Sequence, residues 1–176
     1  MQWFALIVKR RREKAVTESL RDRDIEAFLP VTHMRRRWSD RMKVMDVPLF
    51  PGYVFCRCSY TSRGAVLCTP GVASFVSFGG GPAEVAAEEI DGVRTIVDSG
   101  LPACDGPFVR IGQWVRIVAG PLAGLQGILS REKDALRVVV NVEILQRSVS
   151  VDVERSMTSA VRPDCRDHSI VQSLIA

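Results

Sequence analysis

The sequence predicts an α+β protein of two parts, a mixed unit of helices and strands followed by a small β-barrel. In residues 1–98, short continuous apolar runs alternate with segments whose apolar residues recur every three or four positions. Beyond residue 107 this helical spacing disappears, and short runs rich in Val and Ile are separated by turn residues. The intervening residues 99–107 are rich in Gly and Pro, and we expect them to link the two parts.

The first part contains patterns typical of both strands and helices. Residues 3–8 form a continuous apolar run, which predicts a buried strand. Val16 and Leu20 are four positions apart, which predicts a helix over residues 13–21. Similar signals predict strands over 25–29, 53–58 and 72–78, a short helix over 63–68, and a helix over 86–99 with Ile90, Val93 and Val97 on one face.

The second part is predicted to hold only short strands. They are expected over residues 113–118, 126–129, 137–142 and 147–153, which alternate or run in Val and Ile. A polar tail is expected over residues 161–176. Five interleaved strands suffice for a small core if the sheet closes on itself.

Positive charge is concentrated near the start of the chain. Residues 1–60 hold 13 basic and 7 acidic side chains, whereas residues 61–176 hold 11 and 13, so the whole excess of +4 lies in the first third. Residues 31–47 are polar and basic and contain the turn candidate Ser39-Asp40, so they predict an exposed hairpin or loop. This asymmetry indicates a polyanionic partner for the N-terminal segment.

Several classes of protein do not fit the sequence. No apolar run approaches the roughly 20 residues that span a bilayer, and residues 3–8 precede their basic cluster, the reverse of a signal peptide. We therefore expect a cytoplasmic protein without membrane association. The cysteines are scattered and odd in number, and His33 and His168 supply no second ligand pair, so no disulfide framework, metal or cofactor is predicted.

Motifs of catalysis are also missing. The chain contains no GxSxG, no Walker loop and no HExxH. Gly79-Gly-Gly81 follows a predicted strand, but Pro82 comes next and the P-loop lysine is missing, which favours a turn. We predict a binding protein rather than an enzyme; an enzyme of unrecognised type would need a convergent polar constellation.

Two segments together resemble one known family. The first is Pro48-Leu-Phe-Pro-Gly-Tyr-Val-Phe55, followed by Thr69-Pro-Gly-Val72 and Phe75-Val-Ser-Phe-Gly79. The second is Gly112-Gln-Trp-Val-Arg-Ile-Val-Ala-Gly-Pro-Leu-Ala-Gly-Leu-Gln-Gly127, which looks like a KOW motif. KOW motifs also occur in ribosomal proteins, but the pair, in this order over about residues 2–160, resembles the NusG family of transcription elongation factors.

The resemblance implies a fold, partners and a polymerase site. It implies a ferredoxin-like α/β sandwich with an antiparallel sheet over residues 1–98, which binds the clamp helices of RNA polymerase, and an SH3-like KOW barrel over residues 108–160, in a monomer. The apolar, aromatic polymerase pocket of the family maps onto Phe50, Pro51, Tyr53 and Phe55. An aromatic edge fixed by proline suits a helical partner, whereas the alternative is ordinary core packing.

Two basic clusters are candidates for contact with the non-template DNA strand. Lys9, Arg10, Arg11 and Arg12 precede a predicted helix, where positive charge opposes the helix dipole and so suggests a partner. The second cluster adds an aromatic ring for base stacking and consists of Arg35, Arg36, Arg37 and Trp38. The alternative is a solvated face with Trp38 packed against the sheet.

The KOW segment raises the question of the barrel's partner. Its turn residues are Gly112, Gly120, Pro121, Gly124 and Gly127. We expect Gly112, Gly120 and Gly127 mainly to shape the barrel, with the exposed loop beside them as a docking surface. Residues 144–149 lack the Phe-Gly-Arg step usual in general NusG proteins, which puts binding to Rho in doubt but leaves recruitment of a small-subunit ribosomal protein.

The resemblance is closer to specialised paralogues such as RfaH and the capsule-operon regulators than to housekeeping NusG. We therefore predict an operon-specific antiterminator. In RfaH the C-terminal domain can form a helical hairpin, but residues 138–142 and 148–153 favour strands, so we predict a stable barrel. The alternative function is that of an RNA-binding or ribosome-associated KOW protein that acts without polymerase.

Overall fold

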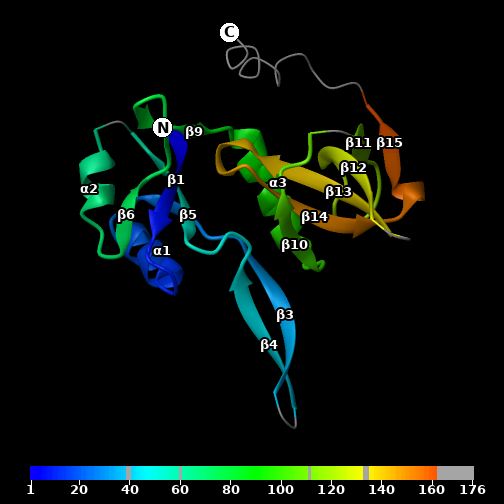
Figure 1. Ribbon diagram of the computed structural model, residues 1–176, viewed down its shortest axis with the longest axis horizontal. Coiled ribbons are helices and arrows are strands. Elements are labelled where there is room, and N and C mark those ends of the chain that lie inside the picture. Colours follow the sequence, from blue (N-terminus) through cyan, green and yellow to red (C-terminus); the bar gives the residue numbers. More distant parts are fainter. Residues whose placement is uncertain (39–40, 60, 111, 133–134, 162–176) are drawn as a thin grey trace.

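The computed structural model describes residues 1–38, 41–59, 61–110, 112–132 and 135–161, and shows two domains joined through helix α3 (Figure 1). The N-terminal sheet has the antiparallel order β2-β5-β1-β6, with β9 also pairing with β1. Its strands are β1 (Gln2–Val8), β2 (Glu26–Phe28), β5 (Tyr53–Cys58), β6 (Val72–Phe75) and β9 (Glu84–Val85). The helices of this domain are α1 (Glu13–Arg21), α2 (Arg63–Leu67) and α3 (Ala87–Asp98). The predicted antiparallel α/β sandwich is confirmed.

Helices pack on both faces of this sheet, which explains why residues 3–8 of β1 are all apolar. Phe4, Leu6 and Val8 point to one face, where they pack with Val16 and Leu20 of α1. On the opposite face, Trp3 and Ala5 belong to the cluster that contains Ile90, Val93 and Ile96 of α3. Ile96 is fully buried, whereas Val97, which was expected on that face, is only partly buried.

A long hairpin projects from the sheet (Figure 1). It consists of β3 (Val31–Trp38) and β4 (Arg41–Pro48), which pair from Val31↔Pro48 to Trp38↔Arg41. The expected hairpin or loop over residues 31–47 is thus a hairpin, although its predicted turn Ser39-Asp40 lies outside the described residues. The expected strand over residues 72–78 is interrupted at Val76, and Ser77–Phe78 (β7) pairs instead with Gly81–Pro82 (β8).

The C-terminal domain is a six-stranded sheet, here called the barrel, with the order β10-β14-β13-β12-β11-β15. Its strands are β10 (Ala103–Pro107), β11 (Gln113–Ile117), β12 (Gln126–Glu132), β13 (Ala135–Val142), β14 (Arg147–Val153) and β15 (Thr158–Ala160), with the 3₁₀ turns η1 (Glu143–Leu145) and η2 (Arg155–Met157). The expected barrel is therefore confirmed, and the described residues beyond 107 hold no α-helix.

One part of the predicted linker is a strand. Residues 103–107 of the expected linker 99–107 form β10, which pairs with β14 from Ala103↔Val151 to Pro107↔Arg147. Asp105, Gly106 and Pro107 are poor strand formers, so only the partner strand specifies this pairing. The connection between α3 and the barrel shortens to residues 99–102.

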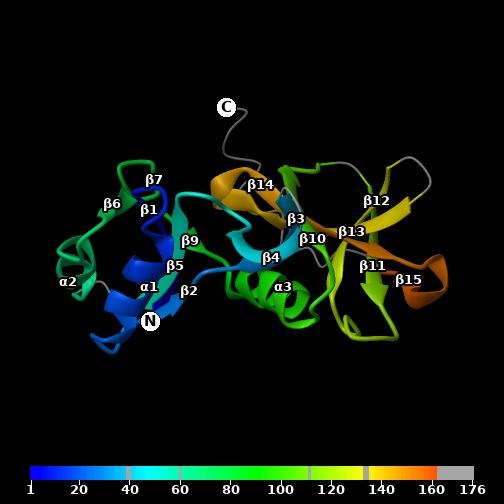
Figure 2. The same ribbon diagram turned by 90° about the horizontal axis from the view of Figure 1, so that it is seen from below.

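The two domains share one apolar cluster. Helix α3 lies between the N-terminal sheet and the barrel, an order that also appears from below (Figure 2). Val140 and Leu125 of the barrel lie against Gly92 of α3, where an added Cβ would be 3.0 Å from Val140 Cγ1 and 3.6 Å from Leu125 Cδ1. Across the same interface the Glu143 amide donates to both carboxylate oxygens of Glu89, at 3.3 Å each. None of the helices in the described part of the chain is long and apolar enough to cross a membrane.

Candidate functional site

The segment between β4 and β5 is a rigid turn that carries the predicted polymerase-binding residues. Its first amide, that of Leu49, donates to the Pro30 carbonyl at 2.9 Å, and the Tyr53 amide donates to the Phe50 carbonyl at 3.1 Å. Gly52 has a φ of +86°, a conformation that favours glycine, and its amide donates to the buried carboxylate of Glu13 at 2.9 Å. Backbone and side-chain bonds therefore fix this turn on the end of the sheet.

The turn brings the aromatic residues together. The rings of Phe50 and Phe55 meet edge to face with centroids 5.9 Å apart, and Phe28 lies 6.3 Å from Phe55. Phe50 and Phe55 are fully buried, Tyr53 is half-buried and Pro51 is exposed. Of the four predicted polymerase-binding residues, only Pro51 and Tyr53 reach solvent in this conformation.

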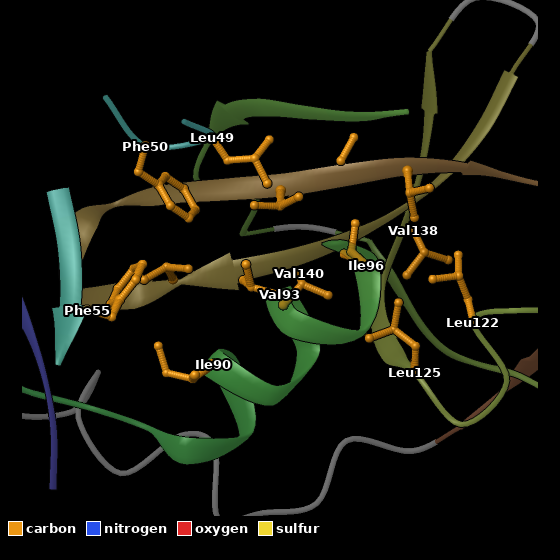
Figure 3. Close-up of a cluster of buried hydrophobic side chains, with 14 of the residues drawn as sticks. Leu49, Phe50, Phe55, Ile90, Val93, Ile96, Leu122, Leu125, Val138 and Val140 are labelled. Carbon is orange, nitrogen blue, oxygen red and sulfur yellow. The ribbon is translucent and has the colours of Figure 1, made fainter. Parts of the chain in front are cut away.

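The barrel is the reason for much of this burial. Leu49, Phe50 and Phe55 belong to the same buried cluster as α3 and the apolar strand residues of the barrel (Figure 3). The barrel members of that cluster include Leu122, Leu125, Val138, Val140, Val142, Val149 and Val151. The aromatic turn is thus covered as long as the two domains stay together.

Part of the same sheet face remains uncovered. Ile7 lies directly opposite Tyr53 across β1 and β5, and its side chain is 40% exposed. Phe78, in the separate two-stranded sheet of β7 and β8, is also exposed, at 65%. The sequence prediction missed Ile7 because it lies in a run that was interpreted as buried. Strand alternation would have placed it on the face of Trp3 and Ala5.

The first basic cluster lies in an exposed loop at the same end of the sheet. Lys9, Arg10, Arg11 and Arg12 are all exposed, and Arg11 has a left-handed φ of 66°. The loop is held by bonds from the Lys9 amide to the Gly71 carbonyl at 2.9 Å and from the Arg12 amide to the Lys9 carbonyl at 3.0 Å. The adjacent Val8 amide donates to Gly52, so this loop adjoins the aromatic turn.

The second basic cluster lies on the hairpin arm. Arg35, Arg36, Arg37 and Trp38 follow one another on β3, opposite Val44, Lys43, Met42 and Arg41 of β4. The side chains of residues 34–43 lie outside the described part, so the backbone alone locates them. Since the hairpin projects from the end of the sheet where β1 finishes, the fold brings both basic clusters to that end (Figure 1).

The KOW residues close a tight loop between β11 and β12. Gly120 and Gly124 have φ of +83° and +94°, and the loop is held by the bonds Ile117 N–H to Leu125 O at 2.9 Å and Gly124 N–H to Ile117 O at 2.8 Å. An added Cβ at Gly127 would lie 2.6 Å from the Val139 carbonyl oxygen, and one at Gly112 would lie 2.2 Å from Ile128 Cγ2. These contacts give both glycines a structural part in the barrel. Pro121 is exposed on the loop.

No metal or thiol chemistry is visible around these residues. Among the described residues, no three His, Cys, Asp or Glu side chains lie close enough together to hold a metal ion. Cys56 and Cys58 are buried on one face of β5, and burial raises the pKa of both thiols, with Cys58 raising that of Cys56 further. Such thiols stay protonated and inert.

Comparisons with known proteins match most of the chain. The family model described as transcription termination factor NusG matches residues 1–94. The transcription termination/antitermination protein NusG of Lactococcus lactis is 26% identical over 148 residues, covering 81% of this chain and 78% of that protein. The corresponding protein of Pseudomonas aeruginosa is 27% identical over 144 residues, covering 77% and 80%. A solved structure described as domain interaction in Thermotoga maritima NusG has the same fold, with a TM-score of 0.51, 22% identity and coverage of 92% and 97%.

Proposed function

Because this chain belongs to the NusG family, whose members are transcription factors rather than enzymes, we propose that it binds the clamp helices of RNA polymerase and suppresses pausing or termination. It would do so as a monomer in the cytoplasm. One observation carries this proposal. A rigid turn and one strand gather Phe50, Tyr53 and Phe55 on a sheet face that continues into the uncovered Ile7. An apolar face of this kind suits the apolar side of a helix.

Binding of a helix to this face requires the barrel to move. Phe50 and Phe55 are buried under the shared cluster, so a helix reaches them only in chains whose domains have parted. The apparent dissociation constant then rises in inverse proportion to the open fraction, about tenfold if one chain in ten is open. The closed arrangement would keep free factor away from polymerase until a recruiting signal stabilises the open form.

The basic clusters support a second contact, with the non-template DNA strand. The loop of Lys9 to Arg12 is exposed beside the aromatic turn, and the hairpin carries Arg35, Arg36 and Arg37 outward from the same end of the sheet. A chain docked by its aromatic face would therefore carry both clusters along one edge of the complex. Such contacts steer and hold a phosphate backbone without reading its sequence.

The barrel would contact a further partner once released. Leu125, a buried residue of the KOW loop that lies against Gly92 of α3, would then become exposed. A small-subunit ribosomal protein is the partner we favour over Rho, because residues 144–149 lack the Phe-Gly-Arg step. The same departure supports an operon-specific, RfaH-like role.

Substitution of the aromatic turn tests polymerase binding. The double change Phe50→Ala and Tyr53→Ala is expected to weaken binding to core RNA polymerase by about 100-fold or more, because truncated aromatic anchors each cost about 1–3 kcal/mol. Binding is measured by titration with labelled polymerase, and circular dichroism verifies that the fold is retained. Val118→Ala, at a 56% exposed apolar residue of the barrel, is the matched control and should bind as the wild type does.

Failure of the wild-type chain to bind polymerase would favour the other candidate, an RNA-binding or ribosome-associated KOW protein. The KOW segment supports that alternative, because its strands β11 and β12 pair with each other and not with the strands around the aromatic turn. Binding of the wild-type chain to ribosomes with no affinity for polymerase would establish it.

Substitution of the hairpin arginines tests the DNA contact. The triple change Arg35→Ala, Arg36→Ala and Arg37→Ala should weaken cross-linking to the non-template strand and lower the salt dependence of that contact by a slope of about 2, since each phosphate contact contributes about 0.7 for single strands. Affinity for polymerase itself should change little. A triple variant that cross-links as strongly as the wild type at every salt concentration would remove the hairpin from the DNA interface.

A further inference from the structure

The tether between the two domains is unusually short. Helix α3 ends at Asp98 and β10 begins at Ala103, which leaves four connecting residues. The first two of them form hydrogen bonds with the end of the helix. The Gly100 amide donates to the Val97 carbonyl at 3.2 Å, and the Ser99 hydroxyl donates to the Ile96 carbonyl at 2.6 Å. Even fully extended, this connection spans only about 17 Å.

A tether of this length restricts how far the barrel can withdraw. An α-helix with its side chains is about 10–12 Å across, so a helix admitted to the aromatic face would push the barrel back by most of the tether's reach. The tether would then be fully extended along one direction, and the barrel could not also turn its own covered residues toward a partner.

Strand β10 could lengthen the tether if its residues left the barrel. It forms one edge of the barrel, and Asp105, Gly106 and Pro107 give it little strand propensity of its own. Ala103 is its buried residue, and that side chain belongs to the cluster shared with α3. The same cluster holds Val149 and Val151 of β14, so the beginning of β10 lies in apolar packing that the barrel strands and α3 share.

Besides the antiparallel pairing of β10 with β14, a few side chains at the barrel edge hold the rest of this segment. Arg147 pairs with Asp105, and the Ser148 hydroxyl donates to the Pro107 carbonyl at 2.8 Å. Beyond the strand, the Asn141 amide group donates to Val109 O at 2.8 Å and accepts from Val109 N at 3.2 Å. Exposed pairs of this type contribute little each, and water can replace them.

We propose that β10 is a releasable strap, which leaves β14 when the barrel parts from α3. Release lengthens the tether from residues 99–102 to residues 99–107, and so extends its reach from about 17 Å to about 34 Å. The proposal rests on the opening of the domain interface described above, but it does not depend on which partner then binds.

Native-state hydrogen exchange of the full wild-type chain tests the strap without any partner. The Glu143 amide reports on the interface, because it donates across it to Glu89. We expect the β10 amides paired with β14 to share one opening free energy and one denaturant dependence with the Glu143 amide, both below those of β12 and β13. The proposal is overturned if the β10 amides exchange only together with those of β13. It is also overturned if they exchange by local fraying whose opening free energy differs from that of the Glu143 amide.

A substitution at the interface tests the coupling directly. Gly92→Glu should accelerate exchange of the Glu143 amide and of the β10 amides by the same factor, at least about tenfold, because it places a carboxylate against Val140 and Leu125. Asp91→Ala, at the exposed neighbouring position, should accelerate neither. Acceleration confined to Glu143, or missing from both sites, contradicts the proposal. Since polymerase is not present, these outcomes are independent of whether the chain binds it.

Discussion

Replacing Gly92 by glutamate is expected to raise the affinity of the chain for RNA polymerase by at least about tenfold. Gly92 faces the barrel at a point where even a methyl group would lie 3.0 Å from Val140 Cγ1. A carboxylate there cannot be buried against Val140 and Leu125 without losing its hydration, which costs several kcal/mol. The open form, which exposes Phe50 and Phe55, would therefore predominate. The gain in affinity equals the inverse of the wild-type open fraction, and it reaches about tenfold when closure is worth about 1.4 kcal/mol.

The measurement is a titration of core polymerase with each variant, combined with small-angle scattering of the free chain. Gly92→Glu should give a larger radius of gyration as well as the tighter binding. Asp91→Glu, one position away on the exposed side of α3, should change neither quantity. An expanded Gly92→Glu chain that binds polymerase no better than the wild type would show that the covered face is not the polymerase site.

Replacing Gly127 by alanine is expected to cost the barrel about 3 kcal/mol of stability. The new Cβ would lie 2.6 Å from the Val139 carbonyl oxygen and 2.7 Å from Val138 Cγ1. The first of these atoms is backbone in the paired strand β13, so relief requires β12 and β13 to separate. Overpacking of a well-filled core costs about 1–3 kcal/mol even where side chains can adjust, and a backbone neighbour adjusts less.

Denaturant unfolding followed separately in each domain measures this loss. Trp114 lies in β11 and reports on the barrel, whereas Trp3 is buried in the N-terminal domain. The barrel transition should move to lower denaturant with little change in the N-terminal one. Gly106→Ala is the control, since its Cβ would make an ordinary contact of 3.5 Å with the Ser148 hydroxyl. Equal midpoints for the two variants would show that β12 and β13 tolerate the added group.

Local pattern was sufficient for the elements whose partners are close in sequence or whose faces are fully covered. Helix α1 begins and ends at the predicted residues, because its apolar stripe of Val16 and Leu20 packs against a buried strand. The KOW loop could be predicted because its glycines, Gly120 and Gly124, are residues that allow a tight turn. Strand β10 was missed because its pairing with β14, at least 40 residues away, overrides the poor strand propensity of Asp105 and Gly106.

The closure of the two domains was beyond the sequence prediction for a different reason. The sequence predicts that Phe50, Pro51, Tyr53 and Phe55 either dock a partner or form core. The burial of Phe50 and Phe55 under the barrel depends on how the domains meet. One residue did carry a signal. Gly92 is a lone glycine in the middle of a helix, where it costs about 1 kcal/mol relative to alanine, and such a glycine often marks a close approach. The predicted roles of the basic and aromatic residues stay predictions.

Site-specific photo-cross-linking in a transcription elongation complex tests most directly whether the chain binds polymerase through its aromatic face. A photoreactive amino acid is placed either at Tyr53, half-buried at the edge of that face, or at Val118, 56% exposed on the barrel. With the Gly92→Glu change in both chains, we predict cross-links from position 53 to the clamp helices of RNA polymerase and none from position 118 to that element. Cross-links to the clamp helices from position 118 but not from position 53 would contradict this account.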